Sequence, residues 1–328
     1  KKTKSGYSTG AEVLEGLKNE HPAVSLLLNY RQLAKLKSTY ADGLQDCIAE
    51  DGRIHSTFNQ TEARTGRISS LEPNLQNIPV RTAEGRRLRE YFNAPAGRVL
   101  CDADYSQIEL RVLASMSGDA NMINAFGSGT DIHTVTASQV FGLPQDMITP
   151  ELRSRAKAVN FGIVYGIGAF SLSKDIGVTR AEADRYIKSY LAAYPGVAAY
   201  MEKAIEDAKK NGFVTTLYGR RRYIPELSNS NGNMRAFGER VARNAPIQGT
   251  AADIIKIAMI KVSRSLKDEF PTARLILQVH DELIVECDEK DAEDICTLLE
   301  REMENAADLA VRLTAEAHFG KTWLEAKA

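Results

Sequence analysis

The strongest constraint on the fold of this chain is a pair of strand-like segments that each end at an aspartate. The first, at 99–111 (VLCDADYSQIELR), delivers Asp104, and the second, at 275–287 (LILQVHDELIVEC), delivers Asp281. If the fold brings the two strand ends together, their carboxylates form a negatively charged pocket that is costly unless divalent cations fill it. The pattern therefore predicts two-metal chemistry on phosphates.

Length and composition allow a large core and one to three domains. The chain has 328 residues, of which 43% are hydrophobic and 26% charged, as is usual for a soluble globular protein. No apolar run is long enough to span a bilayer, and the opening KKTKSGYSTG lacks the apolar stretch of a signal peptide. We expect this opening to be the interior of a longer polypeptide. The four cysteines have no CxxC spacing, which favours reduced thiols in a reducing compartment.

The charge is unevenly distributed although the net charge is only −1. Residues 151–250 contain 16 Lys and Arg against 9 Asp and Glu, whereas residues 251–300 contain 6 against 12. A basic region beside an acidic one suits a protein that grips a polyanion while holding cations at an acidic centre. Solvated helix faces of opposite sign would give the same counts, so charge alone leaves both interpretations open.

Hydrophobic periodicity and turn residues predict an α+β fold in which a helical block interrupts the strands. Strands are expected at 98–104, 274–279, 282–287 and 311–317, with a short hairpin after Asn211-Gly212. Helices are expected at 11–50, 107–116, 131–140, 149–165, 180–193, 197–211 and 290–307, and at 233–267 with an interruption at Pro246 and Gly249.

One predicted helix carries a stripe of functional side chains. Arg153, Lys157, Phe161 and Tyr165 recur every fourth residue, so the row drifts by only about 40° per step and stays on one face. Two cations followed by two aromatic rings would meet the phosphates and then the base of a nucleotide. The alternative is an ordinary amphipathic helix, in which the two cations extend to solvent and the two aromatic rings pack in the core.

A second row at the same spacing contains Arg240, Asn244 and Gln248. An arginine and two amides can read the minor-groove acceptors that every base pair presents, which suits binding without sequence preference. A helix bent by proline with polar filler explains the row equally well. His280 and Asp281 form a polar dipeptide at the tip of an apolar hairpin, which is more often functional, although a polar pair within the core is the alternative.

In order along the chain, these segments resemble the polymerase domain of bacterial family A DNA polymerases, the DNA polymerase I family. DADYSQIELR at 102–111 is similar to motif A, RSRAKAVNFGIVYG at 153–166 to motif B and QVHDE at 278–282 to motif C. Further matching segments are TGRISS at 65–70, PNLQNIPVR at 73–81 and NAPIQGTAADIIK at 244–256.

The resemblance implies a right-hand polymerase fold with an antiparallel-sheet palm, helical fingers and a truncated thumb. Residues 1–50 would be the base of the thumb, 51–125 and 240–328 the palm, and 126–239 the fingers. It also implies a monomer that acts on primer–template DNA and dNTPs in the bacterial cytoplasm, associated with the nucleoid and with no membrane partner.

The resemblance implies two Mg²⁺ ions, for which Mn²⁺ can substitute. Asp104 and Asp281 would ligate the ions about 3.5–4 Å apart, the backbone carbonyl of Tyr105 would help hold one of them, and Glu282 would support the site. Lys157 would also donate a proton to the leaving pyrophosphate.

The resemblance assigns the remaining site residues to the nucleotide or to DNA. Contacts with the incoming dNTP are implied for Arg153, Lys157, Phe161, Tyr165, His133, Glu109, Gln107 and Arg81. Contacts with DNA are implied for Arg67, Arg240, Asn244, Gln248 and His280. Within the first set, Phe161 would stack on the nucleotide and Glu109 would close the sugar pocket against a 2′-OH.

Two other functions compete with a DNA polymerase. A single-subunit RNA polymerase could share the palm, but Glu109 in the sugar-gating position argues against it. A non-catalytic nucleic-acid-binding module would have no need of unpaired acids beside a phosphate, so Asp104 and Asp281 argue against that alternative.

Overall fold

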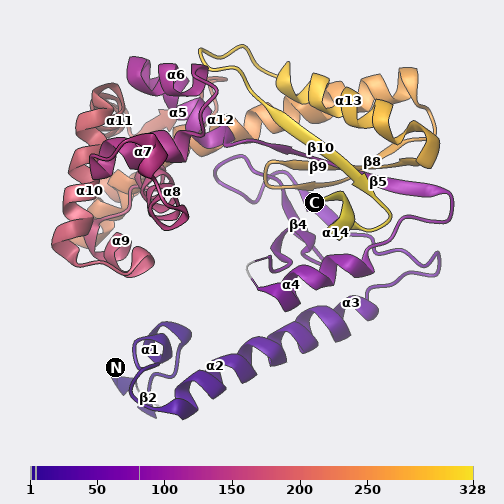
Figure 1. The fold of residues 1–328 in the computed structure, drawn as a ribbon, viewed down its shortest axis with the longest axis horizontal. Helices are drawn as coiled ribbons and strands as arrows, with labels where there is room; N and C mark the ends of the chain where they lie inside the picture. The colour runs from indigo at the N-terminus through magenta and orange to yellow at the C-terminus, as the bar shows by residue number, and fades with distance from the viewer. Residues whose placement is uncertain (1, 4–5, 81, 328) are drawn as a thin grey trace. The chain divides into compact units, whose positions relative to one another are not determined.

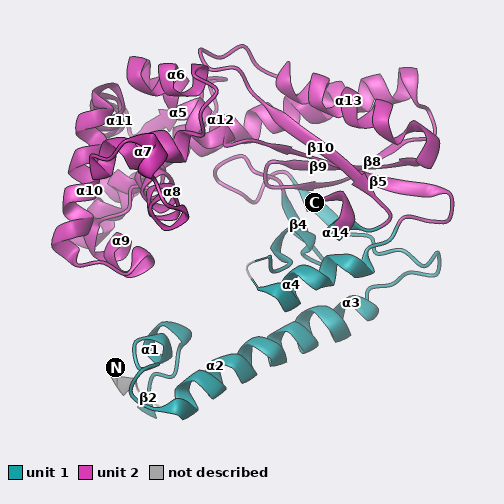
Figure 2. Cartoon of the chain, viewed as in Figure 1, with its two compact units in different colours: residues 1–59, 69–93, 322–324 teal, residues 60–68, 94–321, 325–328 magenta. Residues whose placement is uncertain are grey.

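The computed structural model describes residues 2–3, 6–80 and 82–327, which form two compact units (Figures 1 and 2). Unit 1 draws on residues 1–59, 69–93 and 322–324, and unit 2 on residues 60–68, 94–321 and 325–328. Each unit is therefore assembled from segments that are distant in sequence.

Unit 2 is built around a four-stranded antiparallel sheet in the order β10-β5-β9-β8. The strands are β5 (Arg98–Tyr105), β8 (Arg274–Val279), β9 (Glu282–Asp288) and β10 (Ala315–Gly320). The two central strands, β5 and β9, are buried along nearly their whole length, including their charged residues Asp102, Glu282 and Glu286. The α+β architecture expected from the sequence is confirmed at this level.

The register of this sheet brings the two aspartate-bearing segments to the same end of the sheet. Asp104 lies opposite Glu282 across β5 and β9. The hairpin between β8 and β9 turns at His280 and Asp281, and His280 takes a left-handed φ of 56°. Because β5 and β9 are antiparallel neighbours, the end of β5 and the start of β9 coincide in space.

Helix α13 (Ala292–Glu304) packs against β5 and β10, and Figure 1 shows it running along the sheet. The strand expected at 311–317 is misplaced, because β10 begins only at Ala315. Val311, Leu313 and Ala315 are all buried at alternate positions, so the alternation is real. The alternation arises because one face of an extended segment is buried, whereas the hydrogen-bonded ladder of the sheet starts later.

The helical block of unit 2 contains two helices that the sequence did not predict. These are α6 (Ala120–Gly127), capped by the Asp119 carboxylate, and α9 (Ala169–Ile176). The helices that agree with expectation are α5 (Ile108–Ser117), α7 (Ile132–Phe141), α8 (Pro150–Val164), α10 (Arg180–Ala193) and α11 (Pro195–Asn211). The predicted hairpin is β6 (Phe213–Thr215) and β7 (Arg221–Tyr223).

The predicted interruption at Pro246 and Gly249 is wrong, because α12 runs unbroken from Gly232 to Glu269. Pro246 removes one backbone donor from the helix, but it is buried between two buried residues that hold the helix in place. Gly249 serves close packing: a Cβ atom there would lie 2.6 Å from the methyl carbon of Thr216. Tertiary packing therefore outweighs the local helix-breaking signals.

Unit 1 contains the N-terminal helices and small strand pairs. The expected helical stretch over 11–50 is divided into α1 (Ala11–Glu15), α2 (Pro22–Lys35), a π-helical segment (Leu36–Asp42) and α3 (Gly43–Gln45). The break before α2 follows from Pro22, which starts a helix, and from His21, whose ring accepts the Ala23 amide.

The remaining elements of unit 1 are short. They are β1 (Lys2–Thr3), β2 (Gly6–Tyr7), β3 (Thr57–Asn59), β4 (Ser69–Leu71), α4 (Ala83–Arg87) and the start of α14 (Trp323–Ala326). Trp323 is buried under the Arg89 guanidinium, 4.1 Å from the ring centroid.

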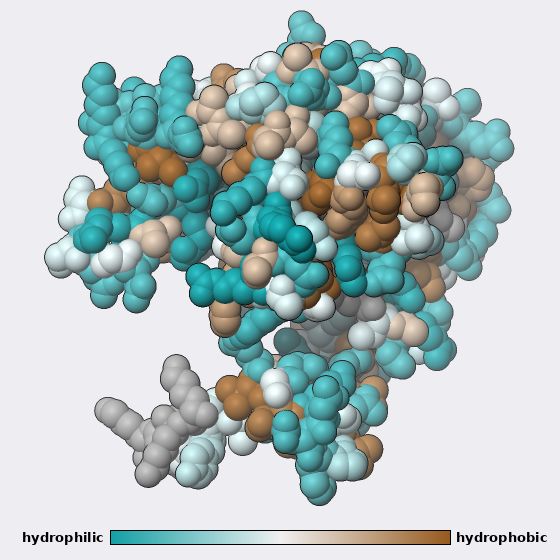
Figure 3. All heavy atoms as spheres, turned by 60° about the vertical axis from the view of Figure 1, so that its left-hand side comes forward, coloured by the Kyte–Doolittle hydropathy of each residue, from teal (hydrophilic) through white to brown (hydrophobic). Residues whose placement is uncertain are grey.

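The face drawn in Figure 3 is largely hydrophilic, with apolar side chains in small groups. Over the described part of the chain, no helix combines the length and apolarity needed to cross a bilayer.

Candidate active site

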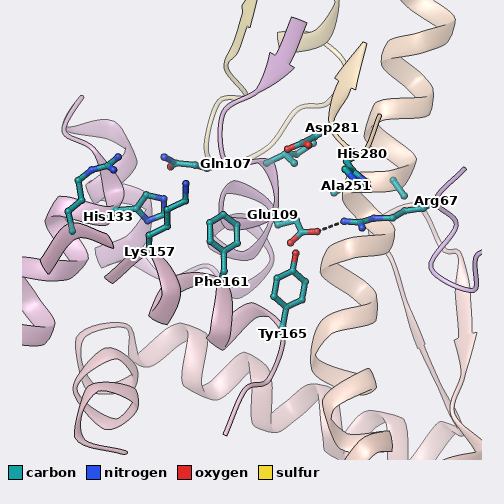
Figure 4. Close-up of a pocket in the computed structure, with 13 residues that line it drawn as sticks. Arg67, Gln107, Glu109, His133, Lys157, Phe161, Tyr165, Ala251, His280 and Asp281 are labelled. Carbon is teal, nitrogen blue, oxygen red and sulfur yellow. Dashed lines mark hydrogen bonds and ion pairs between the residues drawn. The ribbon is translucent and has the colours of Figure 1, made fainter. Parts of the chain in front are cut away.

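A pocket of about 480 Å³ in unit 2 collects most of the residues singled out in the sequence (Figure 4). It is lined by Arg67, Gln107, Ile108, Glu109, His133, Arg153, Lys157, Phe161, Tyr165, Ala251, Ala252, His280 and Asp281. Ten of these are candidates from the sequence, and they come from the edge of the sheet, α5, α7, α8 and the loop before β4. The fold therefore joins motifs that are more than 200 residues apart.

The carboxylates of Asp104 and Asp281 lie at the same end of the sheet. The Tyr105 amide donates a hydrogen bond to the Asp281 carbonyl oxygen over 3.2 Å. Burial and the neighbouring Asp104 charge raise the pKa of Asp281 to about 7. A second negative charge at this position is therefore unfavourable without a cation.

The donor set fits a divalent ion that keeps part of its water shell. Asp104 Oδ1 is buried and makes no hydrogen bond within the described residues. Mg²⁺ commonly binds through one or two carboxylates, completed by water and substrate phosphates. The described residues contain no cluster of three or more Asp, Glu, His or Cys side chains arranged to hold a metal by themselves.

Lys327 is a cation at this carboxylate cluster that the sequence did not predict. Its Nζ atom lies 2.8 Å from Asp104 Oδ2 and 2.9 Å from Glu282 Oε2, with Asp102 Oδ1 at 3.7 Å. Burial alone would lower the pKa of Lys327, but these three carboxylates outweigh it and raise the pKa above its usual value. The ammonium therefore neutralises part of the cluster.

Replacing Lys327 with Met should lower the free energy of unfolding by about 1–3 kcal/mol in EDTA, because buried Glu282 loses its counter-charge. Mg²⁺ should recover part of the loss. Thermal melts with and without Mg²⁺ measure both effects. The matched control is Lys321→Met, which removes an exposed pair with Glu289 and should stay within about 0.5 kcal/mol of wild type. Equal losses in the two variants would contradict the role of Lys327.

The stripe on α8 faces the pocket as its spacing predicts (Figure 4). Thr149 caps the helix and Pro150 occupies its first turn. The guanidinium of Arg153 makes two 2.9 Å contacts with the carboxylate of Asp131. Burial alone would raise the pKa of Asp131, but hydrogen bonds from Arg153 and Thr134 lower it. Arg153 is thus held in place by a partner on a different element.

His133 is a neutral member of the pocket. Its side chain is buried and its ring centroid lies 5.9 Å from that of Phe161. Burial, together with the charges of Lys157 and Arg153, lowers the pKa of His133 to about 4. At neutral pH this imidazole can offer a hydrogen bond to an anion but no charge, unlike the two cations beside it.

Arg67 and Glu109, which were assigned to different ligands from the sequence, form an ion pair. Arg67 Nη2 lies 2.7 Å from Glu109 Oε1, and the glutamate is buried. Figure 4 shows the Tyr165 hydroxyl pointing toward Glu109. Burial and the Glu109 charge raise the pKa of Tyr165 to about 12. These three side chains form one wall of the pocket.

The row on α12 lies outside the pocket lining. Arg240 is exposed and sits against Gly166, where a Cβ would be 3.3 Å from Arg240 Cγ. Asn244 Oδ1 is buried without a hydrogen-bond partner within the described residues. Gln248 is near the Tyr165 hydroxyl. Arg81, the remaining candidate, lies outside the described residues.

Over its whole length the chain is similar to bacterial proteins named DNA polymerase I. DNA polymerase I of Geobacillus stearothermophilus is 50% identical over 329 residues, and that of Bacillus subtilis is 51% identical over 330 residues. Both alignments cover 100% of this chain but only 38% and 37% of the relatives, so the chain spans under two fifths of their length.

A solved structure, the POL domain of Pol1 from M. smegmatis in complex with DNA primer-template and dNTP, matches with a TM-score of 0.94 and 46% identity. The match covers 100% of this chain and 58% of that one. The model of the family described as DNA polymerase family A matches residues 1–325. On this evidence of sequence and fold, the chain belongs to DNA polymerase family A.

Proposed function

We propose that this chain adds dNTPs to a primer 3′-OH under the direction of a template, by two-metal nucleotidyl transfer, in DNA replication and repair. The observation that carries the proposal is that one pocket joins the strand-end acid Asp281 to the cations Arg153 and Lys157. The similar M. smegmatis domain is described as a complex with primer-template and dNTP, which supports the same ligands here.

The architecture would be that of a right hand. The sheet of unit 2 belongs to the palm, formed by residues 51–125 and 240–328. The helices between 126 and 239 form the fingers, and residues 1–50 form part of the thumb. The cation–aromatic stripe of α8 then belongs to the fingers and the carboxylates to the palm, so that closing the site depends on both.

The metal site would consist of Asp104, Asp281 and the backbone carbonyl of Tyr105, with Glu282 in support. Family A polymerases generally use divalent metal ions; two Mg²⁺ ions are proposed here, with Mn²⁺ as a substitute. When bound, such ions lower the pKa of the attacking hydroxyl and neutralise phosphate charge. When no metal is bound, Lys327 would keep the carboxylate cluster neutralised. When the ions bind, Lys327 would either be displaced or share the carboxylates with them.

The incoming dNTP would lie along α8. Arg153 and Lys157 would bind the triphosphate through charge, His133 would donate a hydrogen bond, and Lys157 would protonate the departing pyrophosphate. Phe161 would stack on the nucleotide. The remaining dNTP contacts are proposed for Gln107, Tyr165, Glu109 and Arg81.

Glu109 would exclude ribonucleotides. Its carboxylate is buried and held by Arg67 at 2.7 Å, so a 2′-OH would meet a fixed side chain rather than a mobile one. This rigidity favours a DNA polymerase over a single-subunit RNA polymerase.

Primer–template DNA would contact a separate set of residues. Arg67, Asn244 and Gln248 would approach the minor groove, Arg240 the backbone, and His280 the primer end. The protein would act as a monomer on nucleoid DNA in the bacterial cytoplasm.

Primer extension with Mg²⁺, with dNTPs and rNTPs offered in separate reactions, tests this function. The proposal requires templated extension with dNTPs and much weaker extension with rNTPs. Efficient rNTP addition would favour an RNA polymerase. DNA binding with no addition of either nucleotide would favour a non-catalytic module.

Replacing Phe161 with Tyr should relax discrimination against dideoxynucleotides. A tyrosine hydroxyl can occupy the space and hydrogen-bonding role of the missing 3′-OH, whereas phenylalanine cannot. We expect the preference for dNTP over ddNTP to fall at least about tenfold, as for one hydrogen bond in a buried site. A gel assay of chain termination measures the ratio, and an unchanged ratio would contradict the placement of Phe161 at the incoming nucleotide.

A further inference from the structure

His133 has one ring nitrogen engaged inside the protein. Its Nδ1 atom lies 2.9 Å from Nδ2 of Asn160 on α8, and both residues are buried. Nε2 has no hydrogen-bond partner within residues 2–3, 6–80 and 82–327. Because His133 lines the pocket, Nε2 is the ring atom available to a ligand.

A buried chain of hydrogen bonds continues from Asn160 away from the pocket. Asn160 Oδ1 lies 3.3 Å from the Thr136 hydroxyl, which lies 3.2 Å from the hydroxyl of Tyr194. Thr136, Asn160 and Tyr194 are fully buried. Water therefore has no access to complete the hydrogen bonding of this chain.

Only one order of donors and acceptors along these hydrogen bonds leaves no buried proton without an acceptor. If Tyr194 donates to Thr136, then Thr136 donates to Asn160 Oδ1, and the Asn160 amide donates to His133 Nδ1. In the reverse direction the hydroxyl proton of Tyr194 would need an acceptor, and the Thr136 hydroxyl is the only hydrogen-bond partner of the Tyr194 hydroxyl among the described residues. A buried donor without an acceptor is unfavourable, so the first direction is preferred.

We propose that Asn160 is a positioning residue, which fixes His133 as the tautomer that carries its proton on Nε2 and directs this N–H toward the triphosphate of the incoming nucleotide. The inference rests on the proposed function for the identity of the ligand. The tautomer itself depends only on the chain Tyr194–Thr136–Asn160.

The charged groups around His133 are consistent with a neutral ring. Lys157 and Arg153 on α8 disfavour protonation, whereas Asp131 at the start of α7 favours it. Asp131 is already paired with Arg153, so its effect is reduced. Phe161, whose ring centroid lies 5.9 Å from that of His133, carries no charge.

The tautomer can be measured by long-range ¹H–¹⁵N NMR of the histidine rings in the full chain. There are five histidines, and His133→Gln identifies the relevant signals by their loss. Wild-type His133 should show a protonated Nε2 and an unprotonated Nδ1 at pH 7. The reverse tautomer, or an imidazolium, would overturn the proposal.

Asn160→Asp provides the main variant because it keeps the shape but replaces a donor with a carboxylate that only accepts. The proton of the His133 ring should then move to Nδ1, and the pKa of the His133 imidazole should rise. The matched control is Asn121→Asp, in which another helix-bound amide donates to a backbone carbonyl, that of Ala193; His133 signals should not change. Unchanged His133 signals in Asn160→Asp would overturn the proposal.

Thr136→Val gives an independent test if Asn160→Asp fails to fold. It removes the hydroxyl that orients the amide, so Asn160 can take both orientations and His133 should populate both tautomers. A single unchanged tautomer in this variant would show that the hydrogen-bond chain does not determine the proton position.

Steady-state kinetics with dNTP test whether the tautomer of His133 affects nucleotide binding. Asn160→Asp should raise KM for dNTP by about 10- to 100-fold, as for one hydrogen bond to a charged group, while His133→Gln with Asn160→Asp should be no worse than His133→Gln alone. Additive losses would contradict action through His133. If wild type shows the expected tautomer but adds no nucleotide, the proposed function fails; if it adds nucleotides with the other tautomer, only this inference fails.

Discussion

Replacing Asp281 with Asn is expected to reduce the rate of nucleotide addition by at least about 1,000-fold, since the loss of a metal-binding carboxylate removes several kcal/mol of transition-state stabilisation. The geometry supports this size of effect because, of the two strand-end aspartates, Asp281 is the one that lines the pocket, and it lies beside the Asp104 charge. Single-turnover addition of one templated dNTP measures the rate, and Asp104→Asn should behave in the same way.

Two controls separate chemistry from folding and DNA binding. Asp288→Asn alters the opposite end of β9, where Asp288 pairs with Arg98, and should retain most activity. Binding of primer–template, followed by fluorescence anisotropy, should change little in Asp281→Asn, because the substitution removes no cation that could contact phosphates. Near-normal addition by Asp281→Asn would refute the metal site.

Replacing Lys157 with Met should lower kcat/KM for dNTP by about 100- to 1,000-fold, the range for loss of one preorganised group that stabilises developing charge. Lys157 is exposed on α8 and faces the pocket between Arg153 and Phe161. Unlike Arg153, it forms no ion pair with another described residue, so its ammonium is available to an anion. Pre-steady-state kinetics over a range of dNTP concentrations give kcat and KM separately.

How the loss in kcat/KM divides between kcat and KM distinguishes two roles of Lys157. Charge binding alone would raise KM, whereas proton donation to pyrophosphate would also lower kcat. Lys157→Arg should recover binding more than kcat, because a guanidinium is a poor proton donor. Lys174→Met, which removes a cation over Phe170 on α9, is the matched control, and a loss equal to that of Lys157→Met would contradict the assignment.

Much of the site could be predicted from the sequence because its residues lie on regular elements. A spacing of four on α8 placed Arg153, Lys157, Phe161 and Tyr165 on one face, and all four line the pocket. Likewise, strand-like runs ending at Asp104 and Asp281 indicated acids at sheet edges, and β5 and β9 are neighbours in the sheet.

The partners of these residues could not be predicted, because they are tertiary contacts between distant segments. The pairs Arg153–Asp131 and Arg67–Glu109 cross 22 and 42 residues, and Lys327 reaches Asp104 across 223 residues. No local pattern specifies such contacts. Asn160 is similar, since a buried asparagine within an apolar helix face has no periodic signal, although it lies three residues after Lys157 in the same motif.

Local signals misled where packing opposed them. Pro246 and Gly249 suggested a break in a helix that is continuous, because buried neighbours compensate for the lost backbone hydrogen bond. The apolar residues Val311 and Leu313 suggested a strand that begins before the ladder does, and in the structure both are buried in an extended segment that precedes β10. In both cases the local rule was valid, but tertiary structure determined the outcome.

We propose above all that Asp104 and Asp281, two acids distant in sequence, together hold divalent ions. Iron-mediated cleavage tests it directly: Fe²⁺ replaces Mg²⁺ in a complex with primer–template and dNTP, and ascorbate with peroxide then cuts the backbone near the bound ion. We expect cuts near both Asp104 and Asp281, suppressed by excess Mg²⁺ and absent from Asp281→Asn. Cuts confined to other regions, or none in a complex that still extends primers, would contradict the account.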